Sequence, residues 1–130
     1  MTPLELFLPL LAQGLIWVAE GDGEPIGFAA CEAFDDAMHL WELAVRRDWQ
    51  GQGAGRALVA VCVAEVRVRG LPAATLTTFR DIAWNAPLYA RLGFVGLAQD
   101  ELNARLAADL AAEAARGLDV ARRCAMRLAL

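Results

Sequence analysis

The sequence lacks an apolar run long enough to cross a membrane. Its most apolar stretch, residues 4–19, contains Glu5, Pro9 and Gln13 and so falls short of the ~20 consecutive apolar residues of a transmembrane helix. No basic region precedes this stretch and no small-residue cleavage site follows it, which argues against a secretory signal peptide. We therefore expect no membrane association and place the chain in the cytoplasm.

Paired cysteines and an excess of basic charge are also missing. Cys31, Cys62 and Cys124 are odd in number and form no C-x-x-C pair, so the sequence suggests neither a disulfide framework nor a zinc site, and we expect no metal. Their apolar neighbours predict buried thiols in a reducing compartment. The net charge of −4 disfavours non-specific binding to nucleic acid or to an anionic membrane.

The length and the hydrophobic content predict a single globular domain over residues 1–130. The chain is 58% hydrophobic and 22% charged, a composition typical of a folded protein with a core and not of a disordered one. The apolar fraction is high enough to predict either a very apolar core or a surface buried against a partner.

Hydrophobic periodicity and turn residues predict an ordered series of elements. The expected strands cover residues 15–20, 26–33, 38–45, 73–79, 94–98 and 120–130. The expected helices cover residues 2–12, 54–69 and 84–93, and a last helix begins at Asp100 as its N-cap and stops at Gly117. A hairpin followed by strand–helix–strand–helix–strand predicts an α/β (α+β) protein whose mixed sheet carries packed helices.

The stretch "RRDWQGQGAGRALVA" (residues 46–60) joins a strand to a helix through three closely spaced glycines. Glycine lets the backbone turn tightly and lets N–H groups approach a ligand closely. The first N–H groups of a helix have no partner within the helix and lie at the positive end of its dipole. Arg56, a cation in the first turn, adds to the attraction for an anion. The loop is therefore a candidate phosphate site, with a plain glycine-rich turn as the alternative.

Two nucleotide-binding motifs are excluded. A P-loop ends in G-K-[ST], whereas this chain has Gly55-Arg56-Ala57. The dinucleotide fingerprint requires glycine where Arg56 stands and an acidic residue at the end of the next strand, but residues 73–79 end without one. A phosphate compound of another kind is therefore expected.

The loop resembles the acetyl-CoA loop of the GNAT N-acetyltransferases, [RQ]-x-x-G-x-[GA], through Gln50-Gly51-Gln52-Gly53-Ala54-Gly55. Leu43-Ala44-Val45 matches the hydrophobic triplet that precedes this loop in the family, and Tyr89, Gly93 and Phe94 match its downstream Y-x-x-x-G-F. The resemblance implies acetyl-CoA as co-substrate. It also implies a mostly antiparallel central sheet with a V-shaped splay between two central strands. The family usually places a further strand and helix before the hairpin, and we expect this N-terminal strand and helix to be missing here, because Met1 leaves no room for both.

The resemblance assigns roles to individual residues. The backbones of Leu43, Ala44 and Val45 would bind the pantetheine amides and polarise the thioester oxygen, and Asn85 would hold the coenzyme arm. The remaining cofactor-binding residues are Gln50, Gly51, Gln52, Gly53, Ala54, Gly55 and Arg56.

Two side chains are the expected catalytic residues. Tyr89 would be the general acid, because a phenol of pKa ~10 can protonate a leaving thiolate of pKa ~8.5 when held beside the sulfur. Glu42 would be the base that takes a proton from the amine. Strand alternation puts Glu42 on the face of Leu40 and Ala44, although a bulge would reset that count.

Simpler roles remain open for these residues. Tyr89 could pack against the sheet, and Glu42 could form a salt bridge. His39 could be a second base, but a single histidine in a strand is more often packed or exposed. Arg80, Asp81, Trp84 and Asn85 are candidates to line a pocket. The arginines of "VARRCAMR" are expected on the solvated face of an edge strand.

The function that these residues predict is acetyl transfer from acetyl-CoA to a primary amine on a small molecule or a protein. The alternatives are a non-catalytic acyl-CoA sensor and a structural partner subunit of the same fold. We expect a homodimer, with residues 4–11 and the final strand as the contact surfaces.

Overall fold

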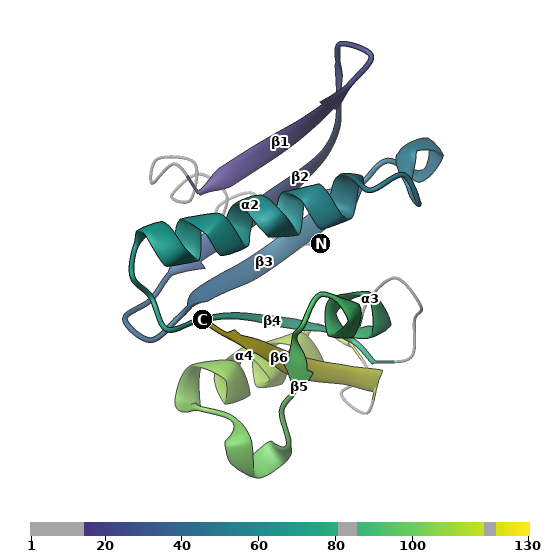
Figure 1. Ribbon diagram of the computed structural model, residues 1–130. Helices are drawn as coiled ribbons and strands as arrows, with labels where there is room; N and C mark the ends of the chain where they lie inside the picture. Colours follow the sequence, from purple (N-terminus) through teal and green to yellow (C-terminus); the bar gives the residue numbers. More distant parts are fainter. Residues whose placement is uncertain (1–14, 81–85, 119–121) are drawn as a thin grey trace. The chain divides into compact units, whose positions relative to one another are not determined.

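The computed structural model describes residues 15–80, 86–118 and 122–130, so the helix predicted over residues 2–12 lies outside the described residues. The chain divides into two compact units, the first reaching Ala74 and including Leu130, the second running from Thr75 to Ala129. The elements of the first unit are β1 (Ile16–Gly21), β2 (Glu24–Ala33), β3 (Met38–Val45), the 3₁₀ turn η1 (Arg47–Trp49) and α2 (Ala54–Val68). β4 (Ala73–Phe79) leads into the second unit, which continues with α3 (Ala86–Arg91), β5 (Val95–Gly96), η2 (Gln99–Glu101), α4 (Ala104–Ala115) and β6 (Arg123–Ala129) (Figure 1).

The predicted fold class is confirmed. The pairs β1–β2, β2–β3 and β5–β6 are antiparallel, and helices pack on the strands of each unit. In the described part of the chain, no helix is both long and apolar enough to cross a bilayer.

The first unit begins with the predicted hairpin. A two-residue turn joins β1 to β2, with Asp22 at φ 53° and Gly23 at φ 80°. Two consecutive residues in the left-handed region form the turn type whose twist matches that of paired strands, and Asp-Gly is a preferred sequence for it. This local chemistry explains why the hairpin was predictable.

A β-bulge in β3 changes which side chains share a face. The register of β2 and β3 runs Ala30↔Glu42 and then Cys31↔Leu40, so Trp41 is an extra residue on β3. Directly paired residues share a face of the sheet, and Leu40 therefore lies on the face of Cys31. The expectation that Glu42 shares the face of Leu40 is wrong, because the bulge interrupts the alternation.

The helix α2 packs on β1, β2 and β3 through one apolar stripe (Figure 1). Its buried residues are Leu58, Val59, Cys62 and Val66, at helical spacing. The Sγ of Cys31 in β2 donates to the Sγ of Cys62 across this interface at 3.4 Å. That hydrogen bond and burial raise the pKa of the Cys31 thiol. Cys31, Cys62 and Cys124 are all buried, as predicted.

The three glycine helix stops are confirmed and share one geometry. Gly70, Gly93 and Gly117 end α2, α3 and α4 with positive φ values of 69°, 100° and 91°. In each case the glycine and the next residue donate backbone hydrogen bonds back into the last turn, which is the Schellman motif. The residue after each glycine donates its backbone N–H to a carbonyl five residues earlier. These bonds join Leu71 to Val66, Phe94 to Tyr89 and Leu118 to Glu113.

The second unit has the strand order β4-β6-β5, so β6 lies between two strands. The expectation that the last strand is an edge strand is therefore wrong. β5 is also shorter than predicted, two residues instead of five. The sequence could not indicate so short a strand, because the apolar residues on either side of β5 continue the apolar run from which the strand was predicted.

A buried ion pair joins α4 to β6. The Nε of Arg123 donates to the Oε1 of Glu113 at 3.1 Å, and the hydroxyl of Thr77 donates to the Oε2 of Glu113 at 2.6 Å. The two charged side chains are only 13% and 8% exposed, and the guanidinium of Arg123 lies 4.5 Å from the centroid of the Phe79 ring. The expectation of a solvated arginine face is thus wrong for Arg123, because α4 places a carboxylate over it.

The N-cap of α4 also differs from the prediction. Asn103 is the cap, and its side-chain oxygen accepts the backbone N–H of Leu106 at 2.8 Å. Asp100 lies one turn earlier, inside η2, whose backbone N–H at Ala98 is bound by the Glu101 carboxylate at 2.8 Å. Asp and Asn are both favoured at the N-cap position. Because the backbone at Leu102 is extended, α4 cannot begin at Asp100, and Asn103 becomes its cap.

Replacing Glu113 with alanine is expected to lower the free energy of unfolding by ~3 kcal/mol or more, because Arg123 is left charged, buried and unpaired. The matched control is Glu65→Ala, which removes the partner of Arg69 in an exposed pair on α2 and should cost about 0.5 kcal/mol. Urea denaturation measures both. Equal losses would contradict the assignment of Glu113 as a buried ionic anchor.

Candidate functional site

The loop between β3 and α2 owes its path to two glycines. Gly51 and Gly53 have φ values of 78° and 93°, in the region that L-residues with a side chain enter only with strain. Gly53 is the residue that precedes the first turn of α2. The backbone therefore turns sharply between the end of β3 and the start of α2.

The first N–H groups of α2 are open. The first backbone bond at this end runs from the N–H of Ala57 to the carbonyl of Gly53 at 3.0 Å. Within the described residues, no side chain caps the helix, and the N–H groups of Ala54, Gly55 and Arg56 have no acceptor. Three unpaired donors at the positive end of a 15-residue helix make this end of α2 a candidate anion-binding site.

Arg56 adds a cation to this end of the helix. Its side chain is exposed, and among the described residues no carboxylate pairs with it. A cation in the first turn is unfavourable by ~0.3–1 kcal/mol in a free helix. An anion bound at the open N–H groups would remove that penalty.

Two glutamine side chains brace the loop internally. The Nε2 of Gln50 donates to the carbonyl of Val45 at 3.0 Å, and the Nε2 of Gln52 donates to the carbonyl of Asp48 at 3.3 Å. The side chains of the predicted cofactor residues Gln50 and Gln52 therefore hold the loop in shape. With both side-chain Nε2 groups bound within the loop, we expect Gln50 and Gln52 to bind a ligand through their backbone groups.

The predicted triplet of β3 lies beneath the start of α2. A Cβ placed on Gly55 would lie 3.9 Å from the Cδ2 of Leu43 and 3.8 Å from the Cγ2 of Val45, an ordinary contact distance. Leu43 and Val45 thus face α2, as packing residues do, while Ala44 alternates to the other face. The side chains support the helix and leave only backbone groups of this triplet for a ligand.

Glu42 is half-buried and points to the face of β3 opposite α2, because Leu43 beside it faces the helix. His39 is fully buried, and its ring packs edge-on against Trp41 with 4.5 Å between centroids. The indole N–H of Trp41 donates to the Oε1 of Glu32 at 3.0 Å. The packed interpretation of His39 therefore agrees with its surroundings.

Tyr89 lies in α3 of the second unit and is 7% exposed. Its ring packs edge-on against Phe94 with 5.7 Å between centroids. Tyr89 and Phe94 occupy the two positions of the Schellman motif that commonly make a hydrophobic contact, with Gly93 at the left-handed position between them. The spacing Y-x-x-x-G-F is therefore also a helix-ending motif, independent of any catalytic role of the hydroxyl group.

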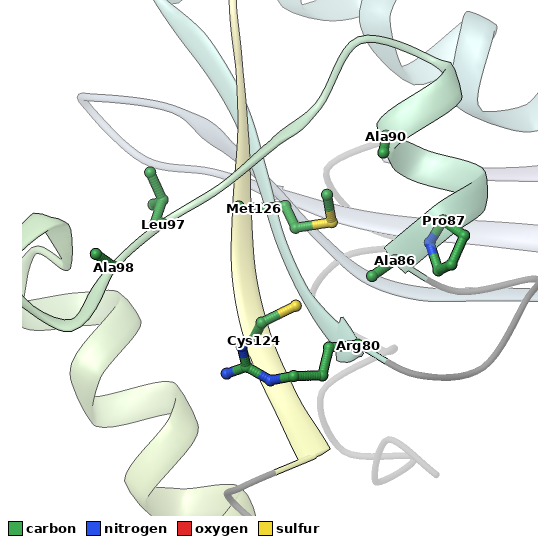
Figure 2. Close-up of a pocket in the computed structure, with 9 residues that line it drawn as sticks. Arg80, Ala86, Pro87, Ala90, Leu97, Ala98, Cys124 and Met126 are labelled. Carbon is green, nitrogen blue, oxygen red and sulfur yellow. The ribbon is translucent and has the colours of Figure 1, made fainter.

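A cavity of about 490 Å³ lies in the second unit beside α3. Figure 2 shows side chains from α3, from β6 and from the segment after β5 around it. The lining residues are Arg80, Ala86, Pro87, Ala90, Gly96, Leu97, Ala98, Cys124 and Met126. Arg80 lines a pocket as predicted, and its guanidinium donates to the carbonyl of Arg123 at 2.7 Å. Asp81, Trp84 and Asn85 lie outside the described residues.

The sequence had not pointed to Cys124 and Met126 as cavity residues. Their signal was the alternation of the last strand, which places both on one face. Burial raises the pKa of the Cys124 thiol, against the opposing charges of Arg80 and Arg123. The thiol therefore stays protonated and serves this cavity as a small apolar group.

The fold and the loop define a class: α/β proteins that present an open, glycine-led helix N-terminus after a sheet strand. The chain belongs to the GNAT acetyltransferase family, whose domain, described as "Acetyltransferase (GNAT) domain", matches residues 12–96. A mycothiol acetyltransferase of Streptomyces coelicolor is 37% identical over 81 residues, covering 61% of this chain and 26% of that protein. Its counterpart in Streptomyces avermitilis is 36% identical over 80 residues, with 60% and 26% covered. The chain thus spans about a quarter of the length of these curated relatives.

Solved structures share the fold. N-acetylglutamate synthase from Neisseria gonorrhoeae, complexed with coenzyme A and N-acetyl-glutamate, has a TM-score of 0.71 at 23% identity, with 97% of this chain and 31% of that chain covered. The PaiA N-acetyltransferase from Thermoplasma acidophilum, in complex with coenzyme A, has a TM-score of 0.67 at 15% identity, with 89% and 60% covered. At these identities the likeness establishes the fold.

Replacing Gly53 with alanine is expected to lower acetyl-CoA affinity by about tenfold or more, since the strained backbone redirects the open N–H groups. Gly23→Ala is the matched control. Gly23 also has a positive φ with no atom within 4 Å of an added Cβ, but it lies in the β1–β2 turn. Both variants should lose ~1–2 kcal/mol of stability. Calorimetric titration that finds equal affinities for the two variants would count against the loop as the phosphate site.

Proposed function

We propose that this chain transfers an acetyl group from acetyl-CoA to a primary amine. The observation that carries the proposal is the open N-terminus of α2, where three backbone N–H groups have no acceptor among the described residues and the exposed Arg56 stands in the first turn. Membership of the GNAT family supports acetyl-CoA as the phosphate compound, and two structural neighbours are described with coenzyme A.

In this proposal the pyrophosphate of acetyl-CoA lies on the loop and the start of α2. The N–H groups of residues 51–56 donate to its oxygens, and Arg56 adds charge. Backbone groups of Leu43, Ala44 and Val45 directed away from β2 bind the pantetheine amides and the thioester oxygen. Asn85 holds the coenzyme arm. Acetyl-CoA itself supplies the activated acetyl group as a thioester.

The 130 residues act together as one domain in this proposal, and each unit contributes a proton-transfer group. The Glu42 carboxylate accepts the proton that the attacking amine loses, either directly or through a water. The Tyr89 hydroxyl donates its proton to the departing sulfur. One proton is removed and one is delivered, so the net charge of the enzyme is unchanged by the reaction. Glu42 then releases its proton and the Tyr89 phenolate takes one up, which restores both groups.

A non-catalytic acyl-CoA sensor is the second candidate. The observation that favours it is the Schellman contact between Tyr89 and Phe94, which accounts for the tyrosine ring without any chemistry. A structural partner subunit is the third candidate, and it predicts no thermal shift with acetyl-CoA.

Tyr89→Phe separates the first two candidates. The phenylalanine keeps the ring and its contact with Phe94 and removes only the hydroxyl, so the melting temperature should stay within a few degrees. If Tyr89 is the acid, release of coenzyme A in the presence of pooled primary amines should fall by ~100-fold or more. Affinity for acetyl-CoA should persist.

The wild-type chain supplies the control for this experiment. An unchanged rate in the Tyr89→Phe variant would remove Tyr89 from the mechanism. A wild-type chain that binds acetyl-CoA, yet releases none of its coenzyme A with any amine in the pool, would favour the sensor.

The acceptor, the location and the assembly state belong to the same proposal. We infer a small-molecule or protein amine as acceptor, a cytoplasmic location and a homodimer. Of the two expected contact surfaces, residues 4–11 lie outside the described residues. β6 lies between β4 and β5 and so is not an edge strand. Sedimentation velocity at low micromolar concentration should find a dimer, and a monomer would contradict this part.

A further inference from the structure

The loop of residues 46–53 between β3 and α2, here called the phosphate loop, closely approaches the β1–β2 hairpin at Trp49. A Cβ added to Gly21, the last residue of β1, would lie 2.6 Å from the Cη2 and 2.7 Å from the Cζ2 of Trp49. Carbon atoms in contact normally lie 3.5–4.0 Å apart. The six-membered ring of the Trp49 indole therefore fills the space that the missing side chain of Gly21 leaves.

Backbone conformation does not explain this glycine. Gly21 does not have a positive φ, whereas Gly23 two positions later does. Glycine is less favourable than alanine in a strand, so the Trp49 ring is the structural reason for the absence of a side chain at Gly21. No sequence motif pointed to this pair, because the two residues meet only in the folded unit.

Weaker contacts tie the same segment to the hairpin. The backbone N–H of Arg46 donates to the carbonyl of Ile26 at 2.7 Å. The guanidinium of Arg46 pairs with Glu24 of β2 at 3.4 Å and with Asp48 of η1 at 3.1 Å. Those ion pairs are exposed and contribute little each. The indole is the one bulky, half-buried group of η1.

We propose that Trp49, seated on Gly21, is a positioning residue for acetyl-CoA: it fixes the phosphate loop to the β1–β2 hairpin. This inference rests on the proposed function. Trp49 is followed directly by Gln50, whose side chain holds the Val45 carbonyl, and then by the left-handed Gly51. A displacement of the indole is thus passed within two residues to the backbone that donates to the phosphates.

The test is a size-swap cycle read by calorimetric titration with acetyl-CoA. Gly21→Ala forces the indole outward by close to an ångström and should weaken binding by about tenfold, because charge-assisted hydrogen bonds depend steeply on geometry. Trp49→Phe shortens the side chain and alone should weaken binding only by about twofold. The double variant should recover most of the affinity lost in Gly21→Ala, because the smaller ring leaves room for the new methyl group.

The matched control is Gly96→Ala. This is also a strand glycine without positive φ, and nothing lies within 4 Å of an added Cβ. Its affinity for acetyl-CoA should stay within about twofold of the wild type. Melting temperatures of all variants report whether each one folds.

Steady-state kinetics distinguish positioning from general destabilisation. The Gly21→Ala variant should show a KM for acetyl-CoA raised about tenfold with kcat changed by less than about twofold, since the residue acts on binding of the donor phosphates and not on the reacting atoms. A merely structural role would lower kcat through loss of folded protein and leave KM unchanged.

The titrations distinguish failure of the proposed function from failure of this inference alone. Wild-type protein that gives no heat with acetyl-CoA would overturn the proposed function and this inference with it. Wild-type protein that binds, together with a folded Gly21→Ala variant of equal affinity, would overturn this inference alone. A Gly21→Ala loss that Trp49→Phe does not reduce would also overturn it. If Gly21→Ala fails to fold, the Trp49→Ala variant supplies the test. Removal of the indole should weaken acetyl-CoA binding by about tenfold, and a folded Trp49→Ala variant of wild-type affinity would overturn the inference.

Discussion

The proposed coenzyme site depends on one backbone constraint: the chain turns from β3 into α2 through backbone conformations that only glycine adopts without strain. Gly51 and Gly53 take positive φ values, and the turn they make leaves the N–H groups of Ala54, Gly55 and Arg56 without acceptors in the described part of the chain. An open helix N-terminus is stable in solvent, but it gains most from an anion. The constraint therefore links a conformational property of two residues to the class of ligand.

The rest of the first unit supports that turn from below and from the side. Leu43 and Val45 pack beneath Gly55, and Gln50 holds the carbonyl of Val45. Trp49 fills the space above Gly21 in the neighbouring hairpin. A binding loop that is braced at both ends loses less conformational entropy when it orders around a ligand. None of these supporting groups needs to touch the ligand to matter for affinity.

The second unit solves a different problem, because its helix α4 covers charge as well as apolar surface. Glu113 and Arg123 are buried together and share Thr77 as a third partner. Such a pair adds little net stability compared with apolar packing, but it strongly disfavours any arrangement that separates the charges. The pair therefore specifies where α4 docks on β4 and β6. The same unit holds Tyr89, whose ring is fixed by a helix-ending motif and whose hydroxyl is the part that catalysis would use.

Sequence alone determined the features that local chemistry controls. The Asp22-Gly23 turn, the glycine ends of three helices, the limits of β3 and β4 and the glycine loop all follow from residues close together in the chain, since turns and caps depend on backbone dihedrals of a few residues. Tertiary structure decided what depends on distant partners. It placed an extra residue in β3 at Trp41, chose Asn103 over Asp100 as the cap of α4, buried Arg123 against Glu113 and set Trp49 on Gly21. These contacts join residues whose proximity no local pattern encodes, because packing energy is gained only after the chain has folded.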